Sequence, residues 1–357
     1  MRIDQIVVAV DEGDAITNMA LNLRTELRRY GESDLYAEAV LSRVFDGDVH
    51  NFENQRPSLG VDATVYHLSY GRPGITSYLQ RRREPLVVAY HNVTPSRWYL
   101  PHSPDFAAGL EWGRYELQHL RDQAVLAIAD SDFNAEELKN VGYKNVHVIP
   151  AGFDPFRLCA EKTEFAFANQ LRRRYPHGFV LAVGQVLPHK QVELLIEAVH
   201  LANSIHRLGL GLVVAGIARE EHYSNALEEF CFSAPFVDVW MAGKVTNSQL
   251  ATLYREARCF LLMSGHEGLS VPPVEAMAMG LPVIARSAGA VAATIGEAGV
   301  IVGNNAGPAV AAEAVAMVVS DPEVSVTLRA RGLRRAAHFA KQDAAAQAAQ
   351  LIADIFS

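Results

Sequence analysis

The segment SGHEGLSVPPVEAMAMGLPVIA (residues 264–285) decides the predicted fold. An apolar, strand-like run over residues 259–263 leads into a loop that is rich in glycine and serine. Pro272 and Pro273 favour a helix start because proline fits the first helical turn, and Gly280 ends the helix before a second apolar run. A strand, a loop, a short helix and a further strand form the repeating unit of parallel α/β sheets.

The same segment predicts an anion site. The free amides and the dipole of the helix start, with the amides of Gly268, Leu269 and Ser270, suit a phosphate group. Glu267 lies in the loop, and Glu275 lies one turn into the helix. Ionised carboxylates only accept hydrogen bonds, so sugar hydroxyls would suit them as partners. An ordinary strand–loop–helix with two surface glutamates is the alternative interpretation.

The spacing of the two glutamates resembles the E-x7-E signature of retaining glycosyltransferases of GT-B architecture, in particular glycosyltransferase family 4 and its bacterial polysaccharide and mannosyltransferase-like branch. The resemblance covers nearly the whole chain in the expected order. It is carried by GDAI (13–16), YHLSYG (66–71), YHNVTP (90–95), SDFNAEEL (131–138), VIPAGFD (148–154), FVLAVGQVLPHKQVELLIEAV (179–199) and GKVTNSQLATLYREARCFLLMS (243–264). It implies an α/β fold of two Rossmann-like domains that face each other across a cleft.

Composition narrows the class of protein. The 357 residues are enough for two domains with full-sized cores, and half of them are hydrophobic. The net charge of −8 argues against a nucleic-acid binder, which would carry a basic face. No leader-like segment precedes the first strand-like run, and the three cysteines lack disulfide or metal spacing. We therefore expect a cytoplasmic protein, with attachment to the inner face of the membrane as the alternative.

Short apolar runs alternate with longer amphipathic segments along the chain, which is typical of parallel α/β folds. We expect an acceptor-binding domain over residues 1–155, a nucleotide-sugar-binding domain over 156–340 and a linker near 151–165. The resemblance implies that a helix over 341–357 packs back on the first domain. Strands are expected at 3–10, 34–40, 64–68, 86–89, 125–129, 147–149, 179–183, 210–215, 237–241, 259–263, 282–285 and 299–302. Helices are expected at 14–30, 106–121, 134–140, 192–202, 220–230, 248–255, 272–279, 309–320 and 322–356.

The predicted donor site lies beyond the strand ends of the second domain. Gly184 ends its first strand, and Lys190 follows in the loop before a helix, where ligands of open α/β sheets bind. Lys190 and a helix N-terminus can stabilise a leaving diphosphate without a metal. The family usually has Gly-Arg … Lys here, and this chain has Gln185 in place of the arginine. Many relatives also carry Pro-Glu where this chain has Ala292 and Ala293.

The resemblance implies a role for each donor-site residue. Glu275 would accept hydrogen bonds from the donor ribose, and Glu267 would contact the transferred sugar. The backbone of Leu269 and Ser270 would hold the diphosphate, and residues 242–246 would edge the nucleobase. The expected donor-binding residues are Gly184, Gln185, Lys190, Gly268, Leu269, Ser270 and Glu275.

The acceptor side is expected in the first domain. His91 aligns with a histidine that family members place near the reacting sugar, and its imidazole could bond the sugar or the leaving oxygen. His67 is a candidate of the same kind, with packing as the alternative for both. Gly13 and Asp14 correspond to a loop near the acceptor, although helix capping explains Asp14 equally well. The catalytic candidates are therefore His91, Glu267 and Lys190.

No metal or other cofactor is predicted. The triplet Asp46-Gly47-Asp48 is typical of a turn, and Asp130-Ser131-Asp132 of a helix cap. The basic runs 81–83 and 172–174 are interpreted as solvated faces, with contact to anionic lipid headgroups as the alternative.

The predicted function is metal-independent, retaining transfer of a sugar from a UDP- or GDP-sugar to a glycan, a lipid-linked sugar or a small glycosylated molecule. A catalytically weak, nucleotide-binding partner subunit of another transferase is the alternative, because Gln185 and Ala293 depart from the family pattern. A dinucleotide oxidoreductase is disfavoured since Asp11-Glu12-Gly13-Asp14 lacks the G-x-G-x-x-G spacing. The nucleotide, the acceptor and the oligomeric state are not predicted.

Overall fold

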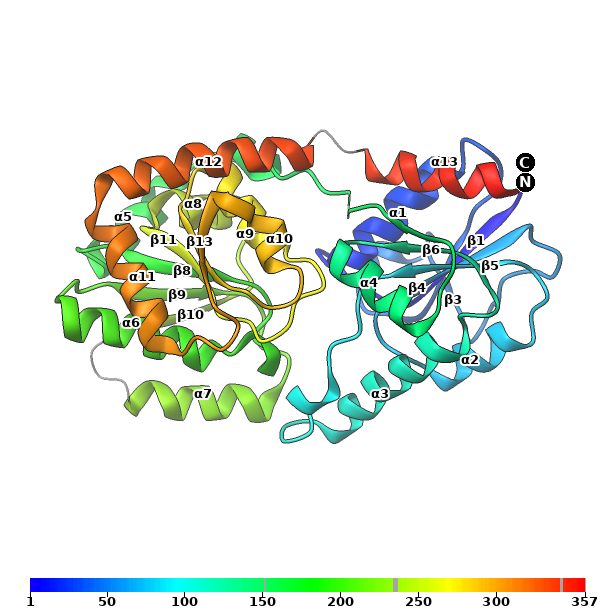
Figure 1. Cartoon of the computed structure of the whole chain (residues 1–357), viewed down its shortest axis with the longest axis horizontal. Coiled ribbons are helices and arrows are strands. Elements are labelled where there is room, and N and C mark those ends of the chain that lie inside the picture. The colour runs from blue at the N-terminus through cyan, green and yellow to red at the C-terminus, as the bar shows by residue number, and fades with distance from the viewer. Residues whose placement is uncertain (151, 234–236, 341–342, 357) are drawn as a thin grey trace. The chain divides into compact units, whose positions relative to one another are not determined.

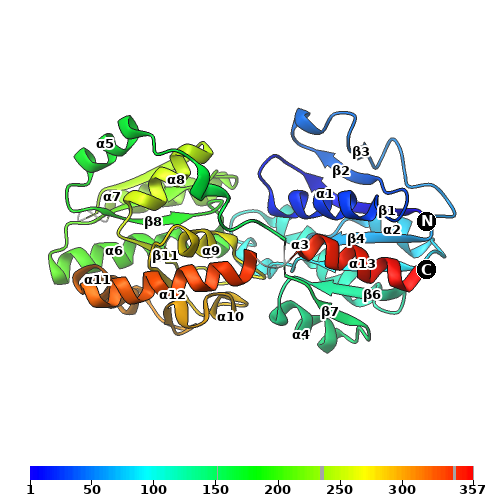
Figure 2. The same cartoon turned by 90° about the horizontal axis from the view of Figure 1, so that it is seen from above.

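The computed structural model describes residues 1–150, 152–233, 237–340 and 343–356. The chain divides into two compact units. The first contains Met1–Arg97, Pro104–Phe153 and Gln342–Ser357, and the second contains Trp98–Ser103 and Asp154–Lys341. Within each unit, helices cover a central parallel sheet (Figures 1 and 2).

The sheet of the first unit is parallel, and in the described residues its strand order is β3-β2-β1-β4-β5-β6-β7. The central strands of this sheet are almost wholly buried, as expected where helices cover both faces, whereas its edge strands are partly exposed. The strands are β1 Ile3–Val10, β2 Leu35–Val40, β3 His50–Asn51, β4 Ala63–Leu68, β5 Leu86–Tyr90, β6 Ala124–Ala129 and β7 Val146–Val148.

Five α-helices accompany this sheet within the described ranges: α1 Ala15–Leu27, α2 Pro73–Gln80, α3 Pro104–His119, α4 Asp132–Val141 and α13 Ala344–Phe356. The last helix, red in Figure 1, lies beside α1, blue (Figures 1 and 2). Leu23 and Leu27 of α1 share one buried cluster with Ala348 and Ile352 of α13. The carboxyl end of the chain therefore completes the core of the first unit.

The sheet of the second unit has the order β10-β9-β8-β11-β12-β13 over the described residues, again parallel. Its strands are β8 Phe179–Val183, β9 Gly211–Ala215, β10 Val239–Gly243, β11 Cys259–Leu262, β12 Val283–Arg286 and β13 Gly299–Val302. Its helices are α5 Phe165–Arg174, α6 Val192–His206, α7 Glu221–Ser233, α8 Asn247–Glu256, α9 Val271–Ala278, α10 Val291–Ile295, α11 Pro308–Ser320 and α12 Pro322–Ala340.

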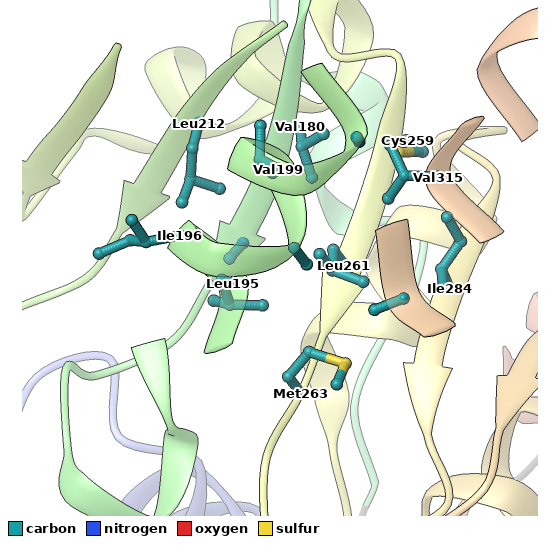
Figure 3. Close-up of a cluster of buried hydrophobic side chains, with 14 of the residues drawn as sticks. Val180, Leu195, Ile196, Val199, Leu212, Cys259, Leu261, Met263, Ile284 and Val315 are labelled. Atoms are coloured by element: carbon teal, nitrogen blue, oxygen red, sulfur yellow. The ribbon is translucent and has the colours of Figure 1, made fainter. Parts of the chain in front are cut away.

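Alternating strand residues divide the core of this unit into two layers. Leu261 and Ile284 belong to a cluster with Ile196 of α6 and Val315 of α11 (Figure 3). Phe260 points to the opposite face because side chains alternate along a strand, and its ring stacks on Tyr254 of α8 at 6.3 Å between centroids. The helix α9 also contacts β11 and β12, which places the carboxyl ends of these strands beside its N-terminus.

The expected strands all overlap observed ones, whereas four observed elements are missing from the sequence prediction: β3, α2, α5 and α10. The strand β3 has two residues and α10 has five, too few to produce a periodic pattern. The run expected as helix over 322–356 forms two helices, α12 and α13. Residues 151, 341, 342 and 357, which belong to the predicted linker and to the predicted C-terminal helix, lie outside the described residues.

Two further features differ from the sequence analysis. The segment Trp98–Ser103, expected in the first domain, groups with the second unit. Arg82, expected on a solvated face, has a side chain only 6% exposed, with Nη2 2.9 Å from Glu84 Oε1. No helix in the described parts of the chain is long and apolar enough to span a bilayer.

Candidate active site

The loops after β8 and β11 meet at one edge of the second sheet because these neighbouring strands are parallel. The amide of Gly265 donates to the carbonyl of His189 over 2.8 Å, which joins the two loops directly. Lys190 ends a 3-10 helix, Pro188–Lys190, in the first loop. Its Nζ lies 2.6 Å from Oε1 of Glu267 in the second loop. Two residues 77 positions apart in the sequence thus form one ion pair.

The segment after β12 constrains the loop that holds Glu267. The carbonyl of Glu267 accepts a hydrogen bond from the amide of Ala290 at 2.9 Å. Gly289 has φ +57°, and a Cβ atom built there would lie 2.1 Å from the same carbonyl oxygen. Glycine is required at this position by both its left-handed backbone and the close approach. The side chain of Glu267 is only 6% exposed, so its orientation depends on this packing.

Glu275 lies in the second turn of α9 and is 4% exposed. Its Oε1 accepts from Nη2 of Arg157 at 2.7 Å and from Nε at 3.0 Å, while Oε2 accepts from the Tyr254 hydroxyl at 3.1 Å. Burial, reinforced by the Glu275 carboxylate, raises the pKa of Tyr254, which therefore stays a hydrogen-bond donor. Sequence analysis missed Arg157, because no local pattern links it to a partner 118 residues away.

The N-terminus of α9 offers donor groups from which an anion could accept hydrogen bonds. The helix begins at Val271, one residue before the predicted start, and its N-cap residue Ser270 makes no side-chain capping bond. The hydroxyl oxygens of Ser270 and Ser264 are buried and have no hydrogen-bond partner among the described residues. A buried hydroxyl usually has a hydrogen-bond partner, so these two are available to a ligand. The loop amides and these hydroxyls are the donors that a phosphate accepts from.

The strand β8 is followed by a glycine with free space where a Cβ atom would lie. Gly184 has φ +144°, and no atom lies within 4 Å of a Cβ built on it. Gly216 on the neighbouring loop packs so closely that its own Cβ would lie 1.8 Å from the Gly184 carbonyl oxygen. Gln185 is half-buried, and its side chain makes no hydrogen bond to the residues that the structure describes.

A segment from the first half of the sequence also lines the β8 loop. The hydroxyl of Tyr99 lies 2.9 Å from Nδ1 of His189, which is 8% exposed. Burial, together with the charge of Lys190, lowers the pKa of His189 well below its usual value, so the ring is neutral. Trp98 packs over Gly265, where an added Cβ would come within 2.2 Å of the indole ring. The loop 264–270 is therefore held on two sides.

The histidines predicted near the acceptor lie in the first unit. His91 Nδ1 is 2.8 Å from Oδ2 of Asp130, and His91 Nε2 is 2.9 Å from Nδ1 of His67. His67 is in turn 2.8 Å from Oε1 of Gln5, and burial lowers its pKa well below the usual value. Both ring nitrogens of His91 are engaged, so a hydrogen bond to a sugar would require one of these partners to give way.

The remaining predicted residues have structural partners. Asp14 caps α1 by accepting from the amide of Thr17 at 2.8 Å, and Gly13 before it has φ +81°. Asp48 pairs with Arg24 at 2.7 Å. In the described part of the chain, no three His, Cys, Asp or Glu side chains are grouped as metal ligands. Lys190 and Glu267 thus lie together in the second unit, while His91 and Asp14 belong to the first.

Comparison with known proteins shows which proteins this chain resembles. Residues 165–335 match the family described as Glycosyl transferases group 1. The chain is 24% identical over 288 residues to the O-antigen chain mannosyltransferase B of Escherichia coli, covering 79% of this chain and 72% of the relative. It is 27% identical over 252 residues to a GDP-mannose-dependent alpha-mannosyltransferase of Mycobacterium tuberculosis. This match covers 68% of this chain and 60% of the relative.

The fold agrees with that match. Sucrose-phosphate synthase from Thermosynechococcus elongatus superposes over 99% of both chains with a TM-score of 0.73 at 18% identity. The chain has the GT-B fold. It is a glycosyltransferase similar to family 4, and the matched family region contains α9, Lys190 and both glutamates.

Proposed function

We propose that this glycosyltransferase transfers a hexose from a nucleoside-diphosphate sugar to a sugar-containing acceptor, retaining the anomeric configuration and requiring no divalent metal. The observation that carries the proposal is the convergence of Lys190, Glu267 and the N-terminus of α9 at one sheet edge. These groups supply a cation, a carboxylate and aligned amides within one loop cluster. A sugar diphosphate presents the complementary set of phosphate oxygens and hydroxyls.

In this proposal the diphosphate lies on the amides of Leu269 and Ser270, within reach of Lys190. As the bond from the anomeric carbon to the diphosphate oxygen breaks, negative charge develops on the leaving group. The acceptor hydroxyl oxygen bonds to the same face of that carbon, and its proton passes to the departing diphosphate. Lys190 and the helix N-terminus stabilise that charge more strongly than the charge of the bound donor, which lowers the barrier. Glu267 accepts hydrogen bonds from the hydroxyls of the transferred sugar.

Glu275 receives the ribose hydroxyls of the donor. Its Oε1 accepts both hydrogen bonds from Arg157, and its Oε2 accepts the bond from Tyr254. Each carboxylate oxygen has two acceptor directions, so Oε2 keeps capacity for a ribose hydroxyl. The arginine holds the carboxylate in place, which limits the ordering that donor binding costs.

Mannose is the first sugar to test, because both relatives described above are mannosyltransferases, one of them named as GDP-mannose-dependent. The acceptor is proposed to be a glycan, a lipid-linked sugar or a small glycosylated molecule. Attachment to the inner face of the membrane belongs to the same proposal. The exposed arginines at 172 and 174 do not favour it, because they pair with Glu256 and Asp238.

The experiment is a donor panel in the presence of EDTA. GDP-mannose, UDP-glucose and related donors are incubated with mono- and disaccharide acceptors, and the released nucleoside diphosphate is measured. NMR of the product gives the anomeric configuration. Transfer with retention in EDTA supports the proposal. Tight nucleotide binding with no sugar release for any donor and acceptor would favour the alternative, a catalytically weak partner subunit.

A further inference from the structure

Arg286 is a buried guanidinium at the carboxyl end of β12, and the whole residue is 7% exposed. Its Nε donates to the carbonyl of Ser264 at 3.1 Å, and its Nη2 donates to Oε1 of Gln191. Nη1 donates to none of the described residues, and no described carboxylate lies within ion-pair distance of the side chain. Burial lowers the pKa of this arginine, opposed by the charge of Glu193.

Other buried or half-buried arginines in the chain have an explanation that Arg286 lacks. The side chains of Arg24 and Arg82, 8% and 6% exposed, each pair with a carboxylate. Arg335 has no carboxylate partner among the described residues, but it donates to two carbonyls at the C-terminus of α10, where the helix dipole favours a cation. Arg286 is bound only to a loop carbonyl and a side-chain amide.

Arg286 is therefore a charged residue of the site without an ion-pair partner among the described residues. Lys190 is balanced by Glu267, and Glu275 is balanced by Arg157. A buried ion is costly unless an opposite charge accompanies it. Within the described residues the loop cluster thus contains one guanidinium with no carboxylate at ion-pair distance, although the charge of Glu193 acts on it from farther away. An anionic ligand could pair with it directly.

Independent observations at the same loop also indicate an anion. The hydroxyls of Ser264 and Ser270, residues 1% and 3% exposed, lack partners in the described structure and lie at the two ends of the loop. Gln191, which accepts from Arg286, has φ +49°, a left-handed conformation that is unusual outside glycine. Gln191 is the residue that follows Lys190, so its bond to Arg286 connects the arginine to the loop of the lysine. Backbone strain of this kind is often kept at functional sites.

The sheet order gives the geometry. The strands β8, β11 and β12 are neighbours, so the loop after β11 lies between the end of β8 and the end of β12. Gln185 follows β8, and Arg286 ends β12. Lys190 and Arg286 therefore flank the loop 264–270 from opposite sides, and each contacts a residue of it.

We infer that Arg286 is a donor-binding residue that contacts the diphosphate through Nη1 and supplies the second cation of the site. The inference rests on the proposed function and adds a residue to it. A guanidinium is suited to this role because it stays protonated when buried and can donate from its remaining nitrogen while the others hold the loop. Arg286, at the end of β12, would thus supply the positive charge that an arginine at position 185, after β8, supplies in the family pattern.

The test compares dissociation constants of GDP and UDP with those of GMP and UMP by calorimetry, in the wild type and in Arg286→Gln, Arg286→Lys and Arg335→Gln. The preference for diphosphate over monophosphate is the decisive readout, because general loosening of the unit would weaken both ligands alike. We expect Arg286→Gln to reduce this preference at least about tenfold, and Arg286→Lys to keep part of it. The matched control Arg335→Gln should lower the melting temperature and leave the preference unchanged.

A double variant, Arg286→Gln with Gln185→Arg, returns an arginine to the site from β8 and should recover part of the lost preference. If Arg286→Gln does not fold, Arg286→Lys carries the test, because it keeps the charge but lacks the Nη1 donor that is proposed to contact the diphosphate. An unchanged preference in Arg286→Gln, or an equal loss in Arg335→Gln, overturns the inference while leaving the proposed function intact. A wild type that binds neither diphosphate overturns both.

Discussion

Lys190 and Glu267 neutralise each other across 2.6 Å, so the cation proposed for the diphosphate and the carboxylate proposed for the sugar form one pair. The lysine side chain is 23% exposed and the glutamate 6%. A donor entering between them would replace one strong hydrogen bond by two, one to a phosphate oxygen and one to a sugar hydroxyl. The pair thus keeps both charges compensated until a ligand of matching polarity arrives.

The variant Glu267→Gln separates the two roles of this pair. Lys190 loses its competing carboxylate. An ion pair that still reaches solvent on the lysine side is worth about 1 kcal/mol, so GDP or UDP should bind up to about fivefold more tightly. The transferred sugar loses a charged acceptor, and kcat should fall by roughly 100-fold or more. Calorimetry and a transfer assay measure the two effects. Weaker nucleotide binding together with unchanged kcat would contradict the assignment.

Arg157→Ala removes the guanidinium that holds Glu275. The buried carboxylate would keep only the Tyr254 hydroxyl, and we expect a loss of about 1–3 kcal/mol in the free energy of unfolding. Donor affinity should also fall, because Glu275 is no longer fixed. Arg157→Lys, which keeps the charge but not the two bonds from Nε and Nη2, should recover part of the stability. Urea unfolding and calorimetry check these values, and a fully stable Arg157→Ala would argue against the packing of Glu275.

Gly289→Ala tests whether the backbone behind Glu267 matters. The new methyl group would meet the Glu267 carbonyl at 2.1 Å in a left-handed conformation that costs about 1–2 kcal/mol for a non-glycine residue. The loop must move, so transfer activity should drop far more than stability. Gly303→Ala is a control, because nothing lies within 4 Å of its Cβ position and its φ is not left-handed. Equal activity of the two variants would show that Glu267 does not depend on this contact.

Acid should destabilise the protein through His189. Its folded pKa is lowered by burial, so the unfolded chain binds a proton that the folded chain does not. The stability is complete above the unfolded value, near pH 6.5, and is lost as the pH falls through and below it, by up to about 1.4 kcal/mol per pH unit. His189→Gln should flatten the dependence of the urea midpoint between pH 7.5 and 5. An unchanged slope would mean that the ring titrates normally.

Local sequence patterns were sufficient for most of the fold. The strands β8 and β13 have the predicted limits because each is an apolar run closed by glycine or a polar residue. The helix α5 was not predicted because its Phe165–Arg174 sequence ends in three arginines and is hydrophilic on average, although its apolar residues recur at helical spacing. The helix α2 begins at Pro73, a start signal of the kind used at Pro272, but Arg72 before it makes no side-chain capping bond, and this helix was not predicted.

Only some residues of the site could be predicted from the sequence. Glu267 and Glu275 stand at a recognisable spacing, and the position of Lys190 after a strand predicted that it lies beyond the carboxyl ends of the same sheet. No local sequence pattern identifies Arg157 or Arg286, because their partners are distant in the sequence. Arg157 binds a residue 118 positions away, and Arg286 binds one 95 positions away. The engagement of both His91 nitrogens also depends on three strands coming together, and only the fold could show it.

The most direct test of the central claim is a crystal structure with the nucleoside diphosphate that most raises the melting temperature, grown in EDTA. The account predicts diphosphate oxygens within about 2.7–3.2 Å of the amides of Leu269 and Ser270 and of the Lys190 ammonium. A diphosphate bound elsewhere on the chain, or one that binds only when a divalent ion is supplied, would contradict it.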